Sequence, residues 1–393
     1  MIGVVHAEIH DVSILENDTA SYNYADFRMW VNDSTDTLRG VYWFMHPNNG
    51  DSRNVVSDSN YQILASNQDF ALMGAHIFNM HMHTGIGDAV IAAMDSFAVL
   101  FSHDEISFIP FFINGYSWGG QFGYHFTKWI PERMLGFITQ KGGYHDTTDA
   151  GAAVEVPGLM FIAENDHPYR IENLTGIFLD HRPLGAKWIL AMEQGVGHTQ
   201  VIDYPFLDSF FNNVANLRLP DSMNVFQPVT LNTLSDSMGW LGDQSTWTIG
   251  AWDCYNGIVD SSSWFPTREV GELWQNFVSE GSIIDTSACD STTVETDFKI
   301  PEKFLLHPPY PNPFNPITTI RYDLPEQTTV NIIIYDMLGR RVKTVVKTNQ
   351  EAGFKSVIWD GTNNQGKPVG AGVYFYQMQA GDFVQTKKMV LLK

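Results

Sequence analysis

The chain of 393 residues has few positive charges before residue 298, only two cysteines and no long apolar run. Residues 1–297 carry 11 Lys and Arg against 37 Asp and Glu, which gives a net charge of −26. Such acidity argues against a protein dedicated to binding nucleic acid or an anionic membrane. No apolar run approaches the ~20 residues that span a bilayer as a helix. We therefore expect no nucleic-acid partner and no transmembrane segment.

The two cysteines are Cys254 and Cys289. In an exported protein they favour one disulfide, and the alternative is a pair of unpaired buried thiols.

The first residues also bear on export. Val5-His6-Ala7 resembles the end of an apolar signal segment with a small residue before the cut, and the alternative is the opening of a first strand.

The composition that is present can build sizeable cores. Hydrophobic residues make up 44% and aromatic residues 13%, which argues against disorder over most of the chain. The charge changes sign near residue 298, because residues 298–393 carry 12 Lys and Arg against 7 Asp and Glu. At ~150 residues per domain, two or three domains are expected. The predicted parts are a core over 1–220, an extension over 221–297, a linker over 298–316 and a C-terminal domain over 304–393.

The first part alternates β-type runs with helical patterns. Strands are predicted over Thr37–Met45, Phe70–Phe78, Phe108–Asn114, Leu135–Thr139, Gly158–Ala163 and Lys187–Met192. Helices are predicted over Ser57–Asp69, Asp88–Phe101, Gln121–Ile130, Ile171–Asp180 and Phe206–Leu217. This alternation predicts an α/β fold with a mostly parallel sheet and helices on both faces.

The extension is rich in Asp, Ser, Thr and Trp, and its clearest element is a helix over Thr267–Val278. Its five tryptophans need burial, so we expect it to pack on the core, with a partly disordered linker as the alternative.

The C-terminal part starts with a proline-rich stretch, His307–Pro316, which suits a stiff linker or an opening edge strand. Short β-runs separated by turn residues follow and predict an all-β sandwich. The predicted strands are Thr318–Asp323, Val330–Tyr335, Lys355–Trp359, Val373–Gln379 and Thr386–Leu392.

The strongest chemical signal is the run Gly115-Tyr116-Ser117-Trp118-Gly119-Gly120, a G-x-S-x-G motif between a predicted strand and a predicted helix. A sharp strand-to-helix turn exposes the hydroxyl of Ser117 and aims the positive end of the helix at the reacting centre. Side chains at the two flanking glycines would clash in such a turn. We predict Ser117 as a nucleophile.

A serine nucleophile needs a base and an acid that orients the base. On this type of fold the chain order is Ser, acid, His. Asp166 follows the strand Gly158–Ala163, and His198 lies in a glycine-flanked loop after the next strand. We predict His198 as the base and Asp166 as the orienting acid, with Glu164 and Asp203 as alternative acids. This chemistry needs no cofactor.

The motifs GYSWGG, AENDHP and GVGH, in that order, resemble the α/β-hydrolase superfamily over about residues 37–217. The resemblance is closest to secreted feruloyl esterases, polyhydroxyalkanoate depolymerases and cutinase-like polyester hydrolases. It implies a secreted serine hydrolase that cleaves carboxylic esters.

An oxyanion hole needs two backbone donors. One is predicted to be the amide of Trp118. Related enzymes carry a glycine after the early strand, whereas this chain reads HPNNGD from His46 onward. Pro47 cannot donate, so the second donor is Asn48 or Asn49, and we favour Asn49 because Asn tolerates unusual backbone angles.

Four side chains are predicted to contact the substrate: Trp118, His81, His83 and Tyr144. We do not predict a metal at the two histidines, because alternate residues of an irregular loop rarely converge without a third ligand. The predicted strands that end at Thr139 and begin at Gly158 are 18 residues apart, too few for a helical lid. An uncovered cleft suits bulky or polymeric esters, unless the extension folds back as a cover.

The tail carries the runs Tyr310-Pro311-Asn312-Pro313-Phe314-Asn315-Pro316, Ile334-Tyr335-Asp336-Met337-Leu338-Gly339-Arg340 and Trp359-Asp360-Gly361. With Gly372-Val373-Tyr374 and the final Lys387-Lys388-Met389-Val390-Leu391, they resemble the type IX secretion system type A sorting domain over about 304–393. The resemblance implies an Ig-like sandwich that the type IX machinery of a Gram-negative bacterium reads, and a secreted or cell-surface location. The alternative is an accessory sandwich that stays attached.

Two other functions remain open at this stage. A serine peptidase or amidase would use the same three residues, and a non-catalytic surface module could keep the same fold. The complete order of Ser117, Asp166 and His198 argues against the non-catalytic module. We expect a monomer.

Overall fold

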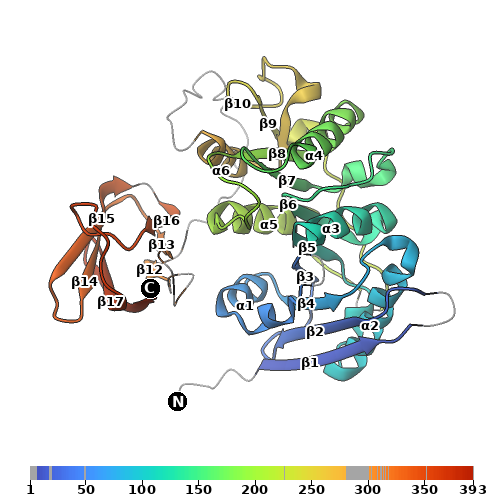
Figure 1. The fold of residues 1–393 in the computed structure, drawn as a ribbon, viewed down its shortest axis with the longest axis horizontal. Coiled ribbons are helices and arrows are strands. Elements are labelled where there is room, and N and C mark those ends of the chain that lie inside the picture. The colour runs from blue at the N-terminus through green and yellow to red at the C-terminus, as the bar shows by residue number, and fades with distance from the viewer. Residues whose placement is uncertain are drawn as a thin grey trace. The chain divides into compact units, whose positions relative to one another are not determined.

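The computed structural model describes residues 7–16, 20–47, 50–224, 226–279 and, with single-residue or two-residue gaps, 301–392. The chain divides into two compact units, Met1–Ser291 and Thr292–Lys393, and each is described by itself (Figure 1). Cys289 and the first six residues lie outside the described part, so the predicted disulfide and the export hint at Val5-His6-Ala7 stay predictions. The domain boundaries inferred from the sequence likewise stay predictions.

The described part of the first unit contains an eight-stranded sheet in the order β1-β2-β4-β3-β5-β6-β7-β8. β1 and β2 run antiparallel to each other, and β2 runs antiparallel to β4. From β4 to β8 all neighbours are parallel. The strands are β1 (Ala7–Ile14), β2 (Ala25–Asn32), β3 (Gly40–Met45), β4 (Phe70–Ile77), β5 (Phe111–Tyr116), β6 (Met134–Gln140), β7 (Gly158–Ala163) and β8 (Trp188–Glu193).

Helices cover both faces of this sheet because successive strand residues point to opposite sides. On one face Trp43 packs against Phe122 and Phe126, and on the other Tyr42 packs against Tyr61 and Phe211. Strand order and two-sided cover together make this an α/β-hydrolase fold (Figure 1). The helices are α1 (Ser59–Ser66), α2 (Ile86–Phe101), α3 (Trp118–Trp129), α4 (Pro168–His181) and α5 (Tyr204–Arg218). No described helix is long and apolar enough to cross a bilayer.

The extension closes the open edge of this sheet at β8. It forms a small sheet of β9 (Trp240–Gly242), β10 (Ile249–Ala251) and β11 (Ser263–Phe265), followed by α6 (Arg268–Val278). Leu190 of β8 donates its amide to Ser263 Oγ at 2.9 Å, and its carbonyl accepts from Trp274 Nε1 at 2.7 Å. Edge strands that offer unpaired backbone groups invite aggregation. The extension therefore supplies the partners that a ninth strand would have supplied.

The second unit is a sandwich of two antiparallel sheets, β12-β13-β16 and β15-β14-β17-β18. Within the proline-rich stretch, Phe314 is buried, donates its amide to the Val390 carbonyl and accepts from the Leu392 amide, so Phe314 packs into the sandwich. The strands are β12 (Leu305–Leu306), β13 (Thr318–Leu324), β14 (Thr328–Asp336), β15 (Arg341–Gln350), β16 (Gly353–Trp359), β17 (Gly372–Ala380) and β18 (Phe383–Leu391).

Candidate active site

Ser117 lies in the sharp turn that joins β5 to α3. Its φ is 55° and its ψ is −119°, a backbone conformation that residues other than glycine seldom adopt. A Cβ on Gly115 would collide with the carbonyl of Gly119, and one on Gly119 would lie 2.6 Å from the Met45 carbonyl oxygen. The turn therefore closes only with glycine at both positions. Strain of this kind concentrates at functional sites.

The structure brings Ser117, His198 and Asp166 into one hydrogen-bonded line. His198 Nε2 lies 2.9 Å from Ser117 Oγ, and His198 Nδ1 lies 2.8 Å from Asp166 Oδ2. A carboxylate only accepts, so Nδ1 carries the proton and Nε2 is left to accept from the serine hydroxyl. The three residues follow β5, β7 and β8, at the carboxyl ends of the parallel strands, where open α/β sheets bind ligands.

The surroundings of Asp166 keep it ionised. Burial by itself raises the pKa of this carboxyl, whose side chain is only 3% exposed. Hydrogen bonds from His198, from the His167 amide at 2.6 Å and from Arg170 Nη1 at 2.9 Å outweigh burial and hold the pKa below its ordinary value. The carboxylate is therefore charged at neutral pH and can fix the tautomer of His198.

The two alternative acids are engaged elsewhere. Glu164 Oε2 accepts a hydrogen bond from the Gly195 amide at 2.8 Å. Asp203 caps α5 by accepting from the Phe206 amide at 3.2 Å. Their contacts hold loops and a helix end in place, so Asp166 is the acid that the geometry joins to His198.

The loop that carries His198 is anchored from the strands beside it. Tyr116 donates its hydroxyl to the His198 carbonyl at 2.8 Å. Two residues at the end of β6 hold the residues that follow, because Gln140 Oε1 accepts from the Val201 amide at 2.9 Å and Lys141 Nζ donates to Thr199 Oγ1 at 3.2 Å. These contacts fix the backbone on both sides of the imidazole.

Gln140 is itself held by a buried polar chain that crosses the sheet. Its Nε2 donates to Asn114 Oδ1 at 2.7 Å, and Asn114 Nδ2 donates to the Tyr42 hydroxyl at 2.9 Å. Burial strongly raises the pKa of Tyr42, so its hydroxyl stays protonated. Buried polar groups that are satisfied in this way make a core rigid and specific.

Of the two backbone donors predicted for an oxyanion hole, only Trp118 lies among the described residues. Trp118 is the first residue of α3, so its backbone N–H has no acceptor within the helix. The close approach of Gly119 to the Met45 carbonyl brings the end of β3 against the nucleophile turn. Asn48 and Asn49 lie outside the described residues, and the role predicted for Asn49 stays a prediction.

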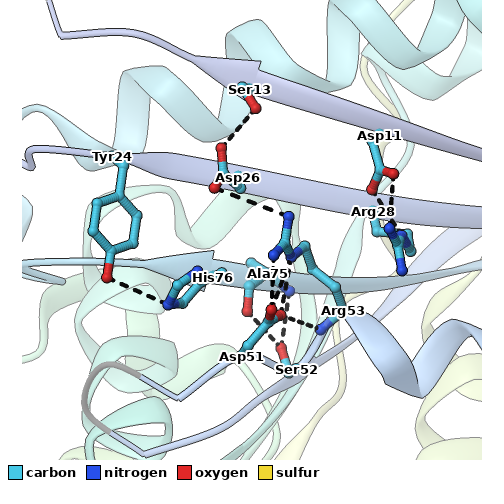
Figure 2. Close-up of polar contacts among 10 residues, drawn as sticks. All are labelled: Asp11, Ser13, Tyr24, Asp26, Arg28, Asp51, Ser52, Arg53, Ala75 and His76. Carbon is cyan, nitrogen blue, oxygen red and sulfur yellow. Dashed lines mark hydrogen bonds and ion pairs between the residues drawn. The ribbon is translucent and has the colours of Figure 1, made fainter.

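Beyond Asn49 the same loop is tied down firmly (Figure 2). Ser52 Oγ donates to the Ala75 carbonyl at 2.9 Å and accepts from the Ala75 amide at 2.8 Å. Arg53 pairs with Asp51 at 2.7 Å and lowers the pKa of that carboxyl to about 2. These contacts attach the part of the loop after Asn49 to β4.

Comparisons with known proteins give one match to a family model and several distant similarities to solved structures. Residues 316–382 match the family model of the FlgD Ig-like domain. No curated protein matches the chain. The S-formylglutathione hydrolase from Agrobacterium tumefaciens is 14% identical with a TM-score of 0.40, over 53% of this chain and 95% of that one. The corresponding enzyme from Staphylococcus aureus is 13% identical with a TM-score of 0.38, over 54% and 98%. Latent PorU from Porphyromonas gingivalis is 24% identical with a TM-score of 0.20, over 23% and 9%.

The other predicted contact residues fall into two groups. The rings of His81 and Trp118 meet at 5.6 Å, and the rings of His81 and His83 stack at 5.5 Å. Tyr144 stands apart from them on the loop after β6 and is 65% exposed. Among the described residues no group of three or more His, Cys, Asp or Glu is arranged to hold a metal ion.

Sequence reasoning missed the residues that support the site. Arg170 is four residues after Asp166 at the start of a helix, and this i, i+4 spacing was a usable signal. Tyr116 sits inside the nucleophile motif, yet nothing local indicates that its hydroxyl reaches the His198 backbone. Gln140 and Lys141 follow a buried strand, and only the fold shows which loop they hold.

Proposed function

We propose that this protein is a serine hydrolase that cleaves carboxylic esters through an acyl-enzyme formed on Ser117. The observation that carries the proposal is the continuous line from Ser117 Oγ to His198 to Asp166, with steps of 2.9 and 2.8 Å. The strained turn at Ser117 and the ionised state of Asp166 support it, because both are needed for this chemistry and neither is needed for the fold.

In the first step His198 Nε2 takes the proton of Ser117 while Oγ attacks the ester carbonyl carbon. Asp166 stabilises the imidazolium that forms and does not itself take the proton. Collapse of the tetrahedral intermediate breaks the bond to the alkoxide, which leaves with the proton from His198. Water then repeats the sequence on the acyl-enzyme and releases the acid. The amide of Trp118 stabilises the oxyanion in both steps, together with a donor from the loop after β3.

The connection between β6 and β7 bears on the size of the substrate. Its described residues form only one short 3₁₀ helix, Gly151–Glu155, and no α-helical lid lies there. The extension packs along the β8 edge, where it pairs with Leu190. These placements support a bulky or polymeric ester as substrate, in line with the feruloyl, acetyl-glycan and polyester hydrolases that the sequence resembles.

The test compares the intact chain with Ser117→Ala on p-nitrophenyl esters and on peptide anilides. We expect ester hydrolysis by the parent chain, little on anilides, and loss of turnover in Ser117→Ala with an unchanged melting curve. Ser96→Ala on α2 is the matched control, because its hydroxyl only contacts the Ala92 carbonyl. Anilide cleavage faster than ester cleavage would favour the peptidase alternative, and full turnover by Ser117→Ala would refute the mechanism.

For the C-terminal unit we propose a role as a sorting signal for the type IX secretion machinery, which places the enzyme outside the cell or on its surface. The Ig-like sandwich, the match to the FlgD Ig-like domain and the net charge of +5 over 298–393 support a module distinct from the acidic hydrolase. The reason for proposing the type IX machinery in particular is the resemblance of the motifs in residues 304–393 to its sorting domain.

A further inference from the structure

Two tyrosines form an exposed stack beside the candidate active site. The rings of Tyr144 and Tyr169 lie 4.8 Å apart with an interplanar angle of 26°. The ring of His167 lies 4.6 Å from Tyr169, and the guanidinium of Arg170 lies 4.9 Å from the centre of the same ring. Tyr144 is the outer member, with 65% of its surface exposed. The stack therefore presents an aromatic face to solvent.

The segments that carry Tyr144 and Tyr169 both contact residues of the candidate active site. A Cβ on Gly142 would lie 3.1 Å from the Ser117 carbonyl oxygen, so the segment that ends in Tyr144 passes directly along the nucleophile. Tyr169 starts the helix that follows Asp166, and its neighbour Arg170 binds the Asp166 carboxylate. A Cβ on Gly143 would lie 2.7 Å from the Tyr169 ring, so glycine there lets the two segments meet.

Stability does not account for Tyr144. Its φ of 59° lies in the left-handed region, which costs a bulky residue about 1–2 kcal/mol. A buried tyrosine could offset that cost through the apolar area it removes from water, but most of this ring stays in solvent. Strain that packing does not repay points to a functional role for the ring.

We propose that Tyr144 and Tyr169 form a stacking subsite for a sugar ring in the alcohol part of the ester, which makes the substrate an esterified neutral glycan. A sugar ring has a flat apolar face and hydroxyl edges, and the stack offers an open aromatic face with the polar His167 ring and Arg170 guanidinium against Tyr169. A purely aromatic group is bound better by an enclosed pocket that buries most of its surface. The net charge of −26 over residues 1–297 disfavours acidic glycans.

This inference rests on the proposed ester hydrolysis, and the experiment separates the two. Initial rates are measured for the full chain on acetylated xylotetraose and on ethyl acetate, which has no ring to stack. The first variant is Tyr144→Asn, because asparagine tolerates a positive φ and removes the ring. The second is Tyr144→Trp, which keeps an aromatic face. Phe226→Ala removes an aromatic ring of equal exposure, 65%, from the extension and serves as the control.

We expect Tyr144→Asn to raise KM for acetylated xylotetraose on the order of tenfold with little change in kcat, and to leave ethyl acetate hydrolysis unchanged. Tyr144→Trp should restore the KM, and Phe226→Ala should alter neither substrate. Equal effects of Tyr144→Asn on both substrates, or none on the glycan, would overturn the subsite. No hydrolysis of either ester by the parent chain would instead overturn the proposed function.

Discussion

Lys141 Nζ lies 2.5 Å from Glu193 Oε2, and the lysine side chain is completely shielded from solvent. Lys141 follows β6 and Glu193 ends β8, so the pair joins the ends of two strands that flank β7, the strand that leads to Asp166. The same ammonium donates to Thr199, the residue after His198. An ion pair in this position connects the segments that carry Asp166 and His198.

Removing one partner of a buried ion pair leaves the other charge uncompensated, so Lys141→Met should lower the free energy of unfolding by about 3 kcal/mol. Denaturant titration of the full chain measures it. The double variant Lys141→Met/Glu193→Met should recover part of the loss, because it removes both charges. Lys128→Met, which breaks a pair with the more exposed Asp146, is the control and should cost less. An unchanged unfolding midpoint for Lys141→Met would contradict the role given to the pair.

Tyr116→Phe removes the hydroxyl that holds the His198 carbonyl. We expect kcat for ester hydrolysis to fall by about tenfold or less, the equivalent of one hydrogen bond, while KM changes little. Steady-state kinetics measure both constants. Tyr374→Phe loses a matching hydroxyl-to-carbonyl bond, to Gly370 at 2.6 Å in the second unit, and should keep the parent kcat. A rise in KM alone would show that Tyr116 contacts substrate rather than positions the base.

Asp166→Asn should reduce kcat by about 10⁴-fold, because an amide can hold the wrong tautomer of His198 and cannot balance the imidazolium. Single-turnover measurements with a fluorogenic ester detect such a loss. Glu164→Gln is the matched control, since a glutamine oxygen can still accept from the Gly195 amide. If Glu164→Gln were the more damaging change, the orienting acid would have been assigned wrongly.

The buried His145 and the half-buried His125 predict acid sensitivity. Burial lowers the pKa of His145 to about 3 and that of His125 to about 4. The unfolded chain, with histidine pKa values of ~6.5, therefore binds more protons as the pH falls below that value. The free energy of unfolding is therefore highest above pH ~6.5 and falls toward pH 4. The loss is on the order of 3 kcal/mol between pH 7 and 5.

Urea unfolding at several pH values tests this expectation. His145→Asn should be less stable at neutral pH, since it loses contacts with Thr139 and Asn173, but its stability should vary less with pH. His83→Asn, at an exposed position, should keep the parent slope. A flat profile for the parent chain would show that these histidines are not kept neutral by the fold.

A fragment of residues 1–297 should be soluble and should retain the rate of the full chain on small esters, because the candidate triad and the elements that hold it precede residue 280. A fragment ending at Pro220 should aggregate, since it lacks the partners of Leu190.

In a host with type IX secretion, residues 298–393 fused to an unrelated periplasmic protein should carry it to the surface or the medium. Export of the 1–297 fragment by the same host would refute the sorting role.

The sequence was most informative where local patterning and chemistry agree. The strand Gly158–Ala163 has the predicted bounds, because its six apolar residues are buried on both faces and bounded by a proline and an acid. Gly115 is required by its contact with Gly119 inside the motif, so this part of the turn could be predicted without the fold, whereas Gly119 is also required by the Met45 carbonyl at the end of β3. Chain order then placed Asp166 and His198 at the same edge of the sheet.

Elements with mixed patterning, and contacts between distant residues, could not be predicted in this way. β2 was missed because its polar positions are paired across the sheet, as where Arg28 of β2 pairs with Asp11 of β1 (Figure 2). β5 begins at Phe111 and not at the predicted Phe108, because Pro110 cannot donate to the ladder. Burial of Lys141 depends on Glu193, a residue far along the chain that no local pattern connects to it.

The β8 edge is exposed for a period during synthesis of the chain, because the residues that close it are made later. Trp274, which completes the pairing of Leu190, is added to the chain 84 residues later. At translation rates of ~5–20 residues per second, the edge stays open for about 4–16 s after its own strand has been made. During that interval nascent chains on neighbouring ribosomes offer each other a free strand edge. Slower synthesis of residues 191–274 should therefore lower the yield of soluble protein without any change in its amino-acid sequence.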